Sequence, residues 1–216
     1  MADQILKLAL PTGNLRETVT NLLMQSDIDV PGYESGSRVL SATAEETGIR
    51  FRIFREGDIP IQVALGNYDI GFCSDINLAE IQVRFPLERV KRIAALPSPV
   101  TEVWLAASPS SGLGAGEIPY GVDLSDVRIA SEYPNFVDLL AAHLQIPRYM
   151  SIHLYGAAEA YPPEDADLII LSVKNRSEIE NLDLIPLHRL YVGGLSLIGN
   201  SKTFSRSNSN SFIERL

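Results

Sequence analysis

Cysteine and histidine are scarce in this chain of 216 residues, and each scarcity excludes a kind of site. The one cysteine, Cys73, excludes an internal disulfide and is typical of a reducing compartment. Because Cys73 lies inside an apolar run, we expect a buried, inert thiol. The three histidines are scattered without metal-ligand spacing, so the sequence predicts no protein-bound metal; they are His143, His153 and His188.

Positive charge is also in short supply. The chain has 18 Lys and Arg residues against 27 Asp and Glu residues, a net charge of −9. This balance argues against nucleic acid and against an anionic membrane surface as partners. A signal peptide and a membrane-length apolar run are missing as well, so we expect a cytoplasmic protein.

The length and the apolar content permit a substantial core. With 45% hydrophobic residues, the chain is long enough for one large domain or two small lobes.

The segment 51–80 has the clearest local pattern. Alternating residues 51–54 predict a strand, 59–65 a short helix and 68–73 a second, apolar strand. Asp58 is expected to cap the first helix, and Ser74 with Asp75 to cap a second that begins at Ile76. Such a unit brings polar side chains and free N–H groups to the carboxyl end of a parallel sheet, where α/β proteins bind ligands.

The same strand–turn–helix pattern opens the chain. Residues 5–10 predict a strand, Gly13 a turn, and 15–25 a helix that Asn14 and Glu17 would cap. This turn is either an anion site or an ordinary βα turn. Similar reasoning predicts a hairpin of 37–43 with 49–54 and strands at 87–96, 102–107, 127–131, 151–154, 168–173, 184–190 and 191–198. It also predicts one helix that follows residues 133–135 and ends at 144, a second helix at 177–182, a surface loop at 108–121, and a polar tail or short helix at 201–216.

Two motifs then carry a family resemblance. Arg-x-x-Asp-Ile-Pro from Arg55, Gly-x-x-Asp-Ile-Gly from Gly66, and Asp75 with Glu80 resemble the catalytic subunit of ATP phosphoribosyltransferase. Arg-Ile-Ala-Ser-x-Tyr-Pro from Arg128 resembles a second motif of that family, and Gly156, Glu159, Pro162 and Ala166-Asp167 match further positions. The alternative is a generic two-lobed binding protein, in which Asp69 orients a turn and Asp75 caps a helix.

The resemblance fails at three places. Asn14 and Val103 stand where the family has arginines. The family's Thr-Gly-x-Thr-Leu loop, which cradles the 5-phosphate of phosphoribosyl pyrophosphate, is replaced by residues 174–179, Lys-Asn-Arg-Ser-Glu-Ile. Lys174 and Arg176 offer cations for another mode of phosphate binding, but Glu178 would repel phosphate and the glycine is gone. The residues themselves favour a plain βα turn that opens an acidic helix.

The resemblance implies an α/β, two-lobed periplasmic-binding-protein-like (type II) fold with a ligand cleft between lobes formed by 1–98 plus 188–216 and by 99–187. It implies transfer of phosphoribosyl from phosphoribosyl pyrophosphate to N1 of ATP, the first step of histidine biosynthesis, with substrate-bound Mg²⁺. It also implies the short form, which associates with itself and with a histidyl-tRNA-synthetase-like regulatory subunit.

The substrate-binding candidates are residues at expected strand ends and turns. They are Gly13, Arg38, Arg55, Asp75, Arg128, Ser131, Tyr133, Glu159, Lys174, Asn175, Arg176 and Ser177. For Arg38 and Arg55, the alternative is a pair of solvated cations at a strand edge. Because the phosphate loop diverges, a second hypothesis stays open: a catalytically silent relative that binds a nucleotide or small molecule, or serves as an assembly subunit.

Overall fold

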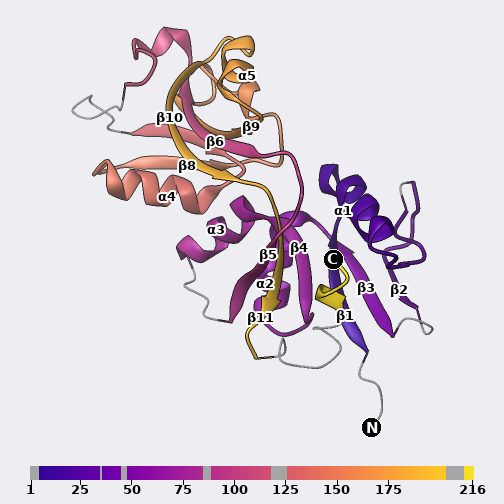
Figure 1. The fold of residues 1–216 in the computed structure, drawn as a ribbon. Helices are drawn as coiled ribbons and strands as arrows, with labels where there is room; N and C mark the ends of the chain where they lie inside the picture. Colours follow the sequence, from indigo (N-terminus) through magenta and orange to yellow (C-terminus); the bar gives the residue numbers. More distant parts are fainter. Residues whose placement is uncertain (1–4, 35, 45–47, 85–88, 118–125, 203–211) are drawn as a thin grey trace. The chain divides into compact units, whose positions relative to one another are not determined.

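The computed structural model describes residues 5–34, 36–44, 48–84, 89–117, 126–202 and 212–216, and it divides the chain into two α/β units (Figure 1). Unit 1 comprises Met1–Ile81, Phe85–Ser98 and Gly194–Leu216. Unit 2 comprises Gln82–Arg84 and Pro99–Gly193. The chain therefore passes from unit 1 to unit 2 after Ser98 and returns after Gly193.

Unit 1 is built on a six-stranded sheet in the order β2-β3-β1-β4-β11-β5. Its strands are β1 (Leu6–Pro11), β2 (Ser41–Ala44), β3 (Ile49–Phe54), β4 (Ile70–Ser74), β5 (Val90–Ala95) and β11 (Leu195–Asn200). The central strands β3, β1 and β4 are parallel. The others are antiparallel to their neighbours. The carboxyl ends of β1, β3 and β4 consequently meet at one edge of the sheet.

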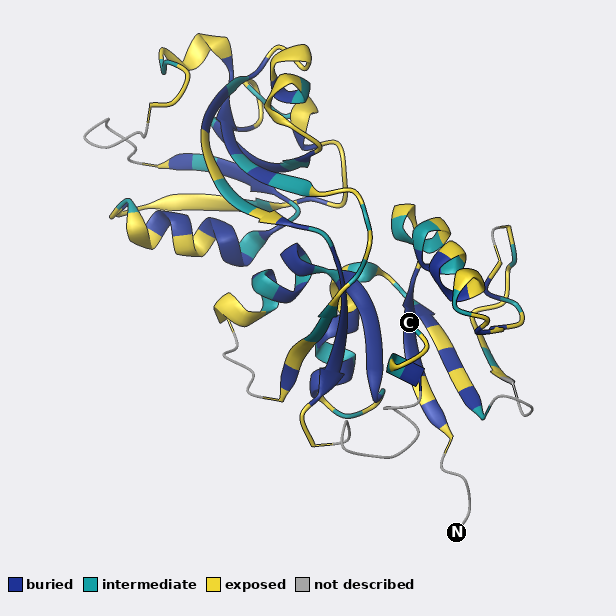
Figure 2. Ribbon diagram, in the orientation of Figure 1, coloured by how far each residue is buried: buried dark blue, intermediate teal, exposed yellow. Residues whose placement is uncertain are grey.

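Successive side chains of a strand point to opposite faces of the sheet, and helices cover both faces here. Leu6, Leu8 and Leu10 pack in one core with the buried face of α1 (Asn14–Gln25). Ala9 packs in another core with α2 (Ile59–Ala64) and with Leu78 of α3 (Asp75–Arg84). A short 3-10 helix, η1 (Glu56–Asp58), precedes α2. Figure 2 shows the alternation as buried and exposed bands along β3.

Gly71 explains why α2 lies so close to β4. A Cβ atom added at Gly71 would lie 2.5 Å from Cγ2 of Ile59 and 3.0 Å from Cγ2 of Val63. Gly66, with φ +77°, ends the α2 segment in the left-handed conformation that favours glycine. The two glycines of the Gly-x-x-Asp-Ile-Gly motif thus serve a helix end and a close helix–strand contact. The predicted strand–helix–strand–helix unit is confirmed by β3, α2, β4 and α3.

Unit 2 is built on a five-stranded sheet in the order β10-β6-β9-β7-β8. Its strands are β6 (Thr101–Ala107), β7 (Val127–Ser131), β8 (Tyr149–His153), β9 (Leu168–Val173) and β10 (Ile185–Gly193). β8, β7 and β9 are parallel, whereas β6 and β10 run antiparallel. The carboxyl ends of β7, β8 and β9 therefore form a second parallel edge.

The helices of unit 2 bury apolar side chains against this sheet. α4 (Pro134–His143) packs against β7 and β8. Ile179 of α5 (Arg176–Asn181) and Ala158 of η3 (Ala158–Ala160) join a core with Ile169, Leu171 and Val173 of β9. η2 (Pro109–Ser111) lies in the segment 108–121 that was predicted as a surface loop, and residues 118–121 of this segment are outside the described part.

The sequence-based division into lobes differs from this one by two short segments. Residues 188–193 belong to unit 2 because β10 pairs with β6 as far as Gly193. Residues 82–84, at the end of α3, are likewise grouped with unit 2.

One prediction about unit 1 is wrong. The hairpin strand begins at Ser41 rather than at residue 37, so Arg38 precedes β2 as an exposed residue outside the strands. The prediction of a polar tail or short helix at 201–216 agrees with the helical residues Phe212 and Ile213. It did not include the packing of Phe212, which is 5% exposed and contacts Phe72 edge-on in the main core.

No helix in the described ranges combines the length and apolar character that crossing a membrane requires.

Candidate functional site

The parallel edge of unit 1 brings together three of the predicted residues. Gly13, Arg55 and Asp75 each follow the last residues of a central strand: β1, β3 and β4. The N–H of Thr12 donates to the carbonyl of Phe54 at 2.8 Å, which joins the ends of β1 and β3. Since the strand order is β3-β1-β4, the three residues lie at successive strand ends.

Gly13 leaves the start of α1 uncovered by a side chain. Gly13 has φ +73°, and nothing lies within 4 Å of a Cβ built on it. It is the N-cap of α1 and, having no side chain, makes no cap hydrogen bond. The predicted capping by Asn14 is therefore wrong, because Asn14 is already the first helical residue. Open backbone at a strand end permits close approach by an anion.

Asp75 is 9% exposed, and its carboxylate is held by groups of unit 1. Oδ1 accepts from Ser196 Oγ at 2.6 Å and from Arg92 Nη1 at 3.2 Å. Oδ2 accepts from the Gly194 N–H at 3.4 Å, while the Asp75 N–H donates to the Gly194 carbonyl at 2.8 Å. Asp75 thus fastens the start of β11 to the end of β4, and a substrate contact by Asp75 stays a prediction.

Glu56 has a similar bridging role that the sequence gave no reason to expect. Its Oε1 accepts from the Ser74 N–H at 2.8 Å and from Asn77 Nδ2 at 2.7 Å. The predicted capping by Ser74 is confirmed, because its Oγ accepts from the Asn77 N–H at 3.2 Å. Burial, together with Glu56 and Asp75 nearby, holds the pKa of the Cys73 thiol well above its usual value, which agrees with the expected inert thiol.

The parallel edge of unit 2 brings together Ser131, Tyr133, Lys174 and Asn175, which lie at or just beyond the ends of β7 and β9. Ser131 is fully buried: its hydroxyl donates to the Ile170 carbonyl at 2.9 Å and accepts from the Tyr133 N–H at 2.8 Å. Both roles of this hydroxyl are structural, because they join β7 to β9 and turn the chain toward α4.

The diverged loop closes on its own side chains. Glu178 Oε2 accepts from the Lys174 N–H at 2.7 Å, and Asn175 Oδ1 accepts from the Glu178 N–H at 3.3 Å. Arg176 Nε donates to Glu180 Oε1 at 3.1 Å, one turn along α5. The favoured interpretation, a βα turn that opens an acidic helix, is confirmed, and Ser177 lies in the first turn of that helix.

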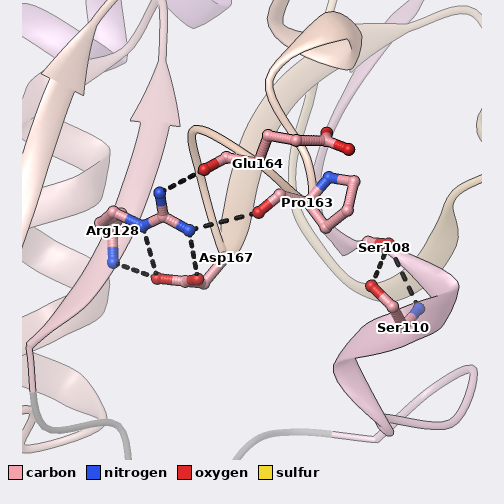
Figure 3. Close-up of polar contacts among 6 residues, drawn as sticks. All are labelled: Ser108, Ser110, Arg128, Pro163, Glu164 and Asp167. Carbon is pink, nitrogen blue, oxygen red and sulfur yellow. Dashed lines mark hydrogen bonds and ion pairs between the residues drawn. The ribbon is translucent and has the colours of Figure 1, made fainter.

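Arg128 lies near the beginning of β7, away from the carboxyl edge, and its guanidinium binds the segment before β9 (Figure 3). Nη2 and Nε donate to the Asp167 carboxylate at 2.8 and 3.2 Å. Nη1 donates to the Glu164 carbonyl at 2.6 Å, and Nη2 also donates to the Pro163 carbonyl at 3.2 Å. These bonds raise the pKa of Arg128 and lower the pKa of Asp167.

The predicted strand at 127–131 is confirmed and places Arg128 near its beginning, whereas the ion pair with Asp167 left no sign in the sequence. Substrate binding by Arg128 stays a prediction. Figure 3 also shows Ser108, whose Oγ accepts from the Ser110 N–H at 3.2 Å and caps η2. Glu159 is an exposed residue of η3, in the connection from β8 to β9.

Metal binding has no ready-made ligand set in the described ranges. Among these residues, the structure contains no group of three or more His, Cys, Asp or Glu side chains placed to hold an ion.

Comparison with solved structures identifies the class of fold. The chain resembles the ATP phosphoribosyl transferase (HisG:HisZ) complex from Thermotoga maritima with a TM-score of 0.77 and 23% identity, over 97% of this chain and 96% of that one. It resembles the alkanesulfonate-binding protein SsuA from Xanthomonas axonopodis pv. citri with a TM-score of 0.57 and 12% identity, over 100% of this chain and 71% of that one. These likenesses confirm an α/β fold of the periplasmic-binding-protein type.

Sequence comparisons then identify the family. Residues 55–216 match the family model for HisG, ATP phosphoribosyltransferase. ATP phosphoribosyltransferase of Moorella thermoacetica is 26% identical over 205 residues, covering 94% of this chain and 87% of the relative. The enzyme of Aquifex aeolicus is 26% identical over 216 residues, covering 98% and 94%. The chain belongs to the HisG family of ATP phosphoribosyltransferases.

Proposed function

We propose that the chain transfers the phosphoribosyl group of phosphoribosyl pyrophosphate to N1 of ATP in histidine biosynthesis. The observation that carries this proposal is the HisG family match over residues 55–216. Full-length similarity to ATP phosphoribosyltransferases supports it. The comparisons give no support to the alternative of a catalytically silent binder.

The proposed reaction asks the protein to position substrates rather than to supply a nucleophile. N1 of ATP attacks the anomeric carbon, the bond from that carbon to the pyrophosphate oxygen breaks, and pyrophosphate leaves with the bond electrons. Holding two substrates in line and stabilising the leaving charge suffices for such a displacement. The absence of a Ser/His or Cys/His pair among the candidate residues is therefore compatible with catalysis.

The two parallel edges offer different groups to these substrates. In unit 1, we assign the uncovered backbone at Gly13 and the exposed Arg55 to anionic parts of the substrates. In unit 2, Lys174 and Arg176 are the cations nearest the diverged loop. Since Glu178 occupies the Lys174 N–H, phosphate binding there requires the carboxylate to move or the lysine side chain to act instead.

Magnesium belongs to the proposal only as a substrate counter-ion. Because the described residues offer no ligand cluster, we assign Mg²⁺ to the pyrophosphate it would accompany and give it no protein ligand.

We also propose a partner and a cellular location. The HisG:HisZ composition of the T. maritima complex supports assembly with a HisZ-type, histidyl-tRNA-synthetase-like subunit. Association with further copies of this chain rests on the family resemblance alone. The single buried, unpaired cysteine supports a reducing, cytoplasmic environment.

Turnover tests the function directly. Purified chain, with and without the HisZ-type subunit of the same organism, is incubated with ATP, phosphoribosyl pyrophosphate and Mg²⁺, and phosphoribosyl-ATP is quantified by mass spectrometry. We expect product that depends on both substrates. No product in either preparation, when each substrate still binds, would overturn the proposal.

A further inference from the structure

Tyr155 is a large aromatic residue in an unusual position. It is 80% exposed, the highest value among the exposed large hydrophobic side chains in the described ranges. It lies just beyond His153, the last residue of β8, and so at the parallel edge of unit 2. The His153 and Tyr155 rings lie 4.8 Å apart between centroids, with 38° between their planes.

The backbone around Tyr155 explains how the two rings come to be presented together. Leu154, between them, is buried and donates its N–H to the Ser131 carbonyl at 2.8 Å, which anchors the strand end to β7. The residues on either side of Leu154, His153 and Tyr155, are both exposed. Gly156, with φ +117°, turns the chain immediately afterwards. The exposed ring pair is thus fixed at its base by a buried residue and a glycine turn.

We propose that His153 and Tyr155 form a stacking platform for the adenine ring of ATP, an inference that rests on the proposed transferase function. Aromatic rings bind bases through their faces, which needs no hydrogen-bonding group on the protein. This mode suits the reaction, because the N1 lone pair lies in the plane of the base and stays accessible while its face is covered. Substrate binding at the carboxyl ends of parallel strands is typical of α/β folds.

Binding measurements separate recognition of the base from recognition of phosphate. The Kd of ATP and of tripolyphosphate is measured by titration calorimetry for the wild type and for Tyr155→Ala, Tyr155→Phe and Tyr149→Ala. Tyr149 is the matched control, because it lies at the opposite end of the same strand. We expect Tyr155→Ala to raise the Kd of ATP roughly 5- to 150-fold and to leave that of tripolyphosphate unchanged. Tyr155→Phe and Tyr149→Ala should stay within about twofold of the wild type.

Other outcomes overturn the platform. The proposal is wrong if Tyr155→Ala leaves the Kd of ATP unchanged, or if it weakens the binding of ATP and tripolyphosphate equally. It is also wrong if Tyr155→Phe weakens ATP binding as much as Tyr155→Ala does, or if the wild type binds no ATP. The turnover assay distinguishes the two proposals. If Tyr155→Ala weakens ATP binding as expected but the wild type makes no phosphoribosyl-ATP, the stacking platform stands and the transferase function is wrong. If the protein is active and Tyr155→Ala leaves its KM for ATP unchanged, the transferase function stands and the stacking platform is wrong.

Discussion

Asp75 in unit 1 and Glu178 in unit 2 are carboxylates in related places, each in the helix that follows a central parallel strand. Asp75 is buried and accepts bonds from three residues in two other segments of unit 1: Arg92 of β5, and Gly194 and Ser196 at the start of β11. Glu178 is partly exposed and accepts from Lys174, four residues away in its own loop. The first carboxylate joins distant strands, whereas the second shapes a local turn, so we expect very different consequences when each is removed.

Asp75→Ala tests the larger side of this comparison. The substitution leaves the Ser196 hydroxyl and the Gly194 N–H without their acceptor, so we expect a loss of about 3 kcal/mol in the free energy of unfolding. Urea unfolding of both proteins measures it. Glu178→Ala is the matched control and should change stability by less than about 0.5 kcal/mol. Equal losses for the two variants would mean that burial does not distinguish these carboxylates.

Asp167 is intermediate between these two carboxylates. It pairs with Arg128, which is distant in sequence, but its side chain is 44% exposed. Arg128 holds the pKa of Asp167 below its ordinary value of 3.8, so the pair stabilises the fold above that pH and loses its contribution as the pH falls through the lowered pKa. We expect Arg128→Leu to reduce stability at pH 7, by less than Asp75→Ala does. The deficit should shrink in more acidic buffer.

Urea unfolding at several pH values checks this dependence. Arg148→Leu breaks the exposed Arg148–Asp126 pair in the same unit and serves as the control, with little expected effect at any pH. A deficit in Arg128→Leu that stays constant from neutral to acidic pH would contradict the proposed role of Asp167.

Glu178→Ala also sharpens the comparison on the side of function. Removing the carboxylate frees the Lys174 N–H and deletes a negative charge, so we expect phosphoribosyl pyrophosphate to bind at this loop about tenfold more tightly. Ligand-induced shifts in thermal unfolding measure the change. Glu180→Ala removes the same charge from the same helix without freeing the Lys174 N–H. Equal gains in both variants would assign the effect to charge alone.

Sequence patterns predicted where strands lie along the chain better than they predicted the contacts at the strand ends. The regular alternation in 51–54 and the apolar run before Ser74 predicted β3 and β4, because burial of one or both strand faces leaves a periodic signal. The bridge from Glu56 to Asn77 leaves none, since the two residues are 21 positions apart and each is an ordinary polar residue locally. The resemblance found Arg128, but its ion pair with Asp167 joins segments that lie 39 positions apart in the sequence.

Helix caps show the same limit on a smaller scale. Asp58 precedes α2 and has the preferred chemistry of an N-cap, yet it already has helical dihedral angles, φ −84° and ψ −20°, as part of η1. An extended backbone is what lets a cap side chain reach back to the first-turn N–H groups, and Asn175, with φ −164° and ψ 169°, has it. Residue type alone therefore predicted two caps, at Asn14 and Asp58, that the structure does not contain.

Paired substitutions at these two positions give the smallest effects and the sharpest test of that reasoning. We expect Asn175→Ala to lower the free energy of unfolding by about 1 kcal/mol, because the Glu178 N–H loses its acceptor. Asp58→Ala should change it by less than about 0.5 kcal/mol, because no cap bond exists there to lose. Urea unfolding measures both. An equal loss at Asp58 would mean that its carboxylate stabilises α2 through the helix dipole, without the hydrogen bond that defines a cap.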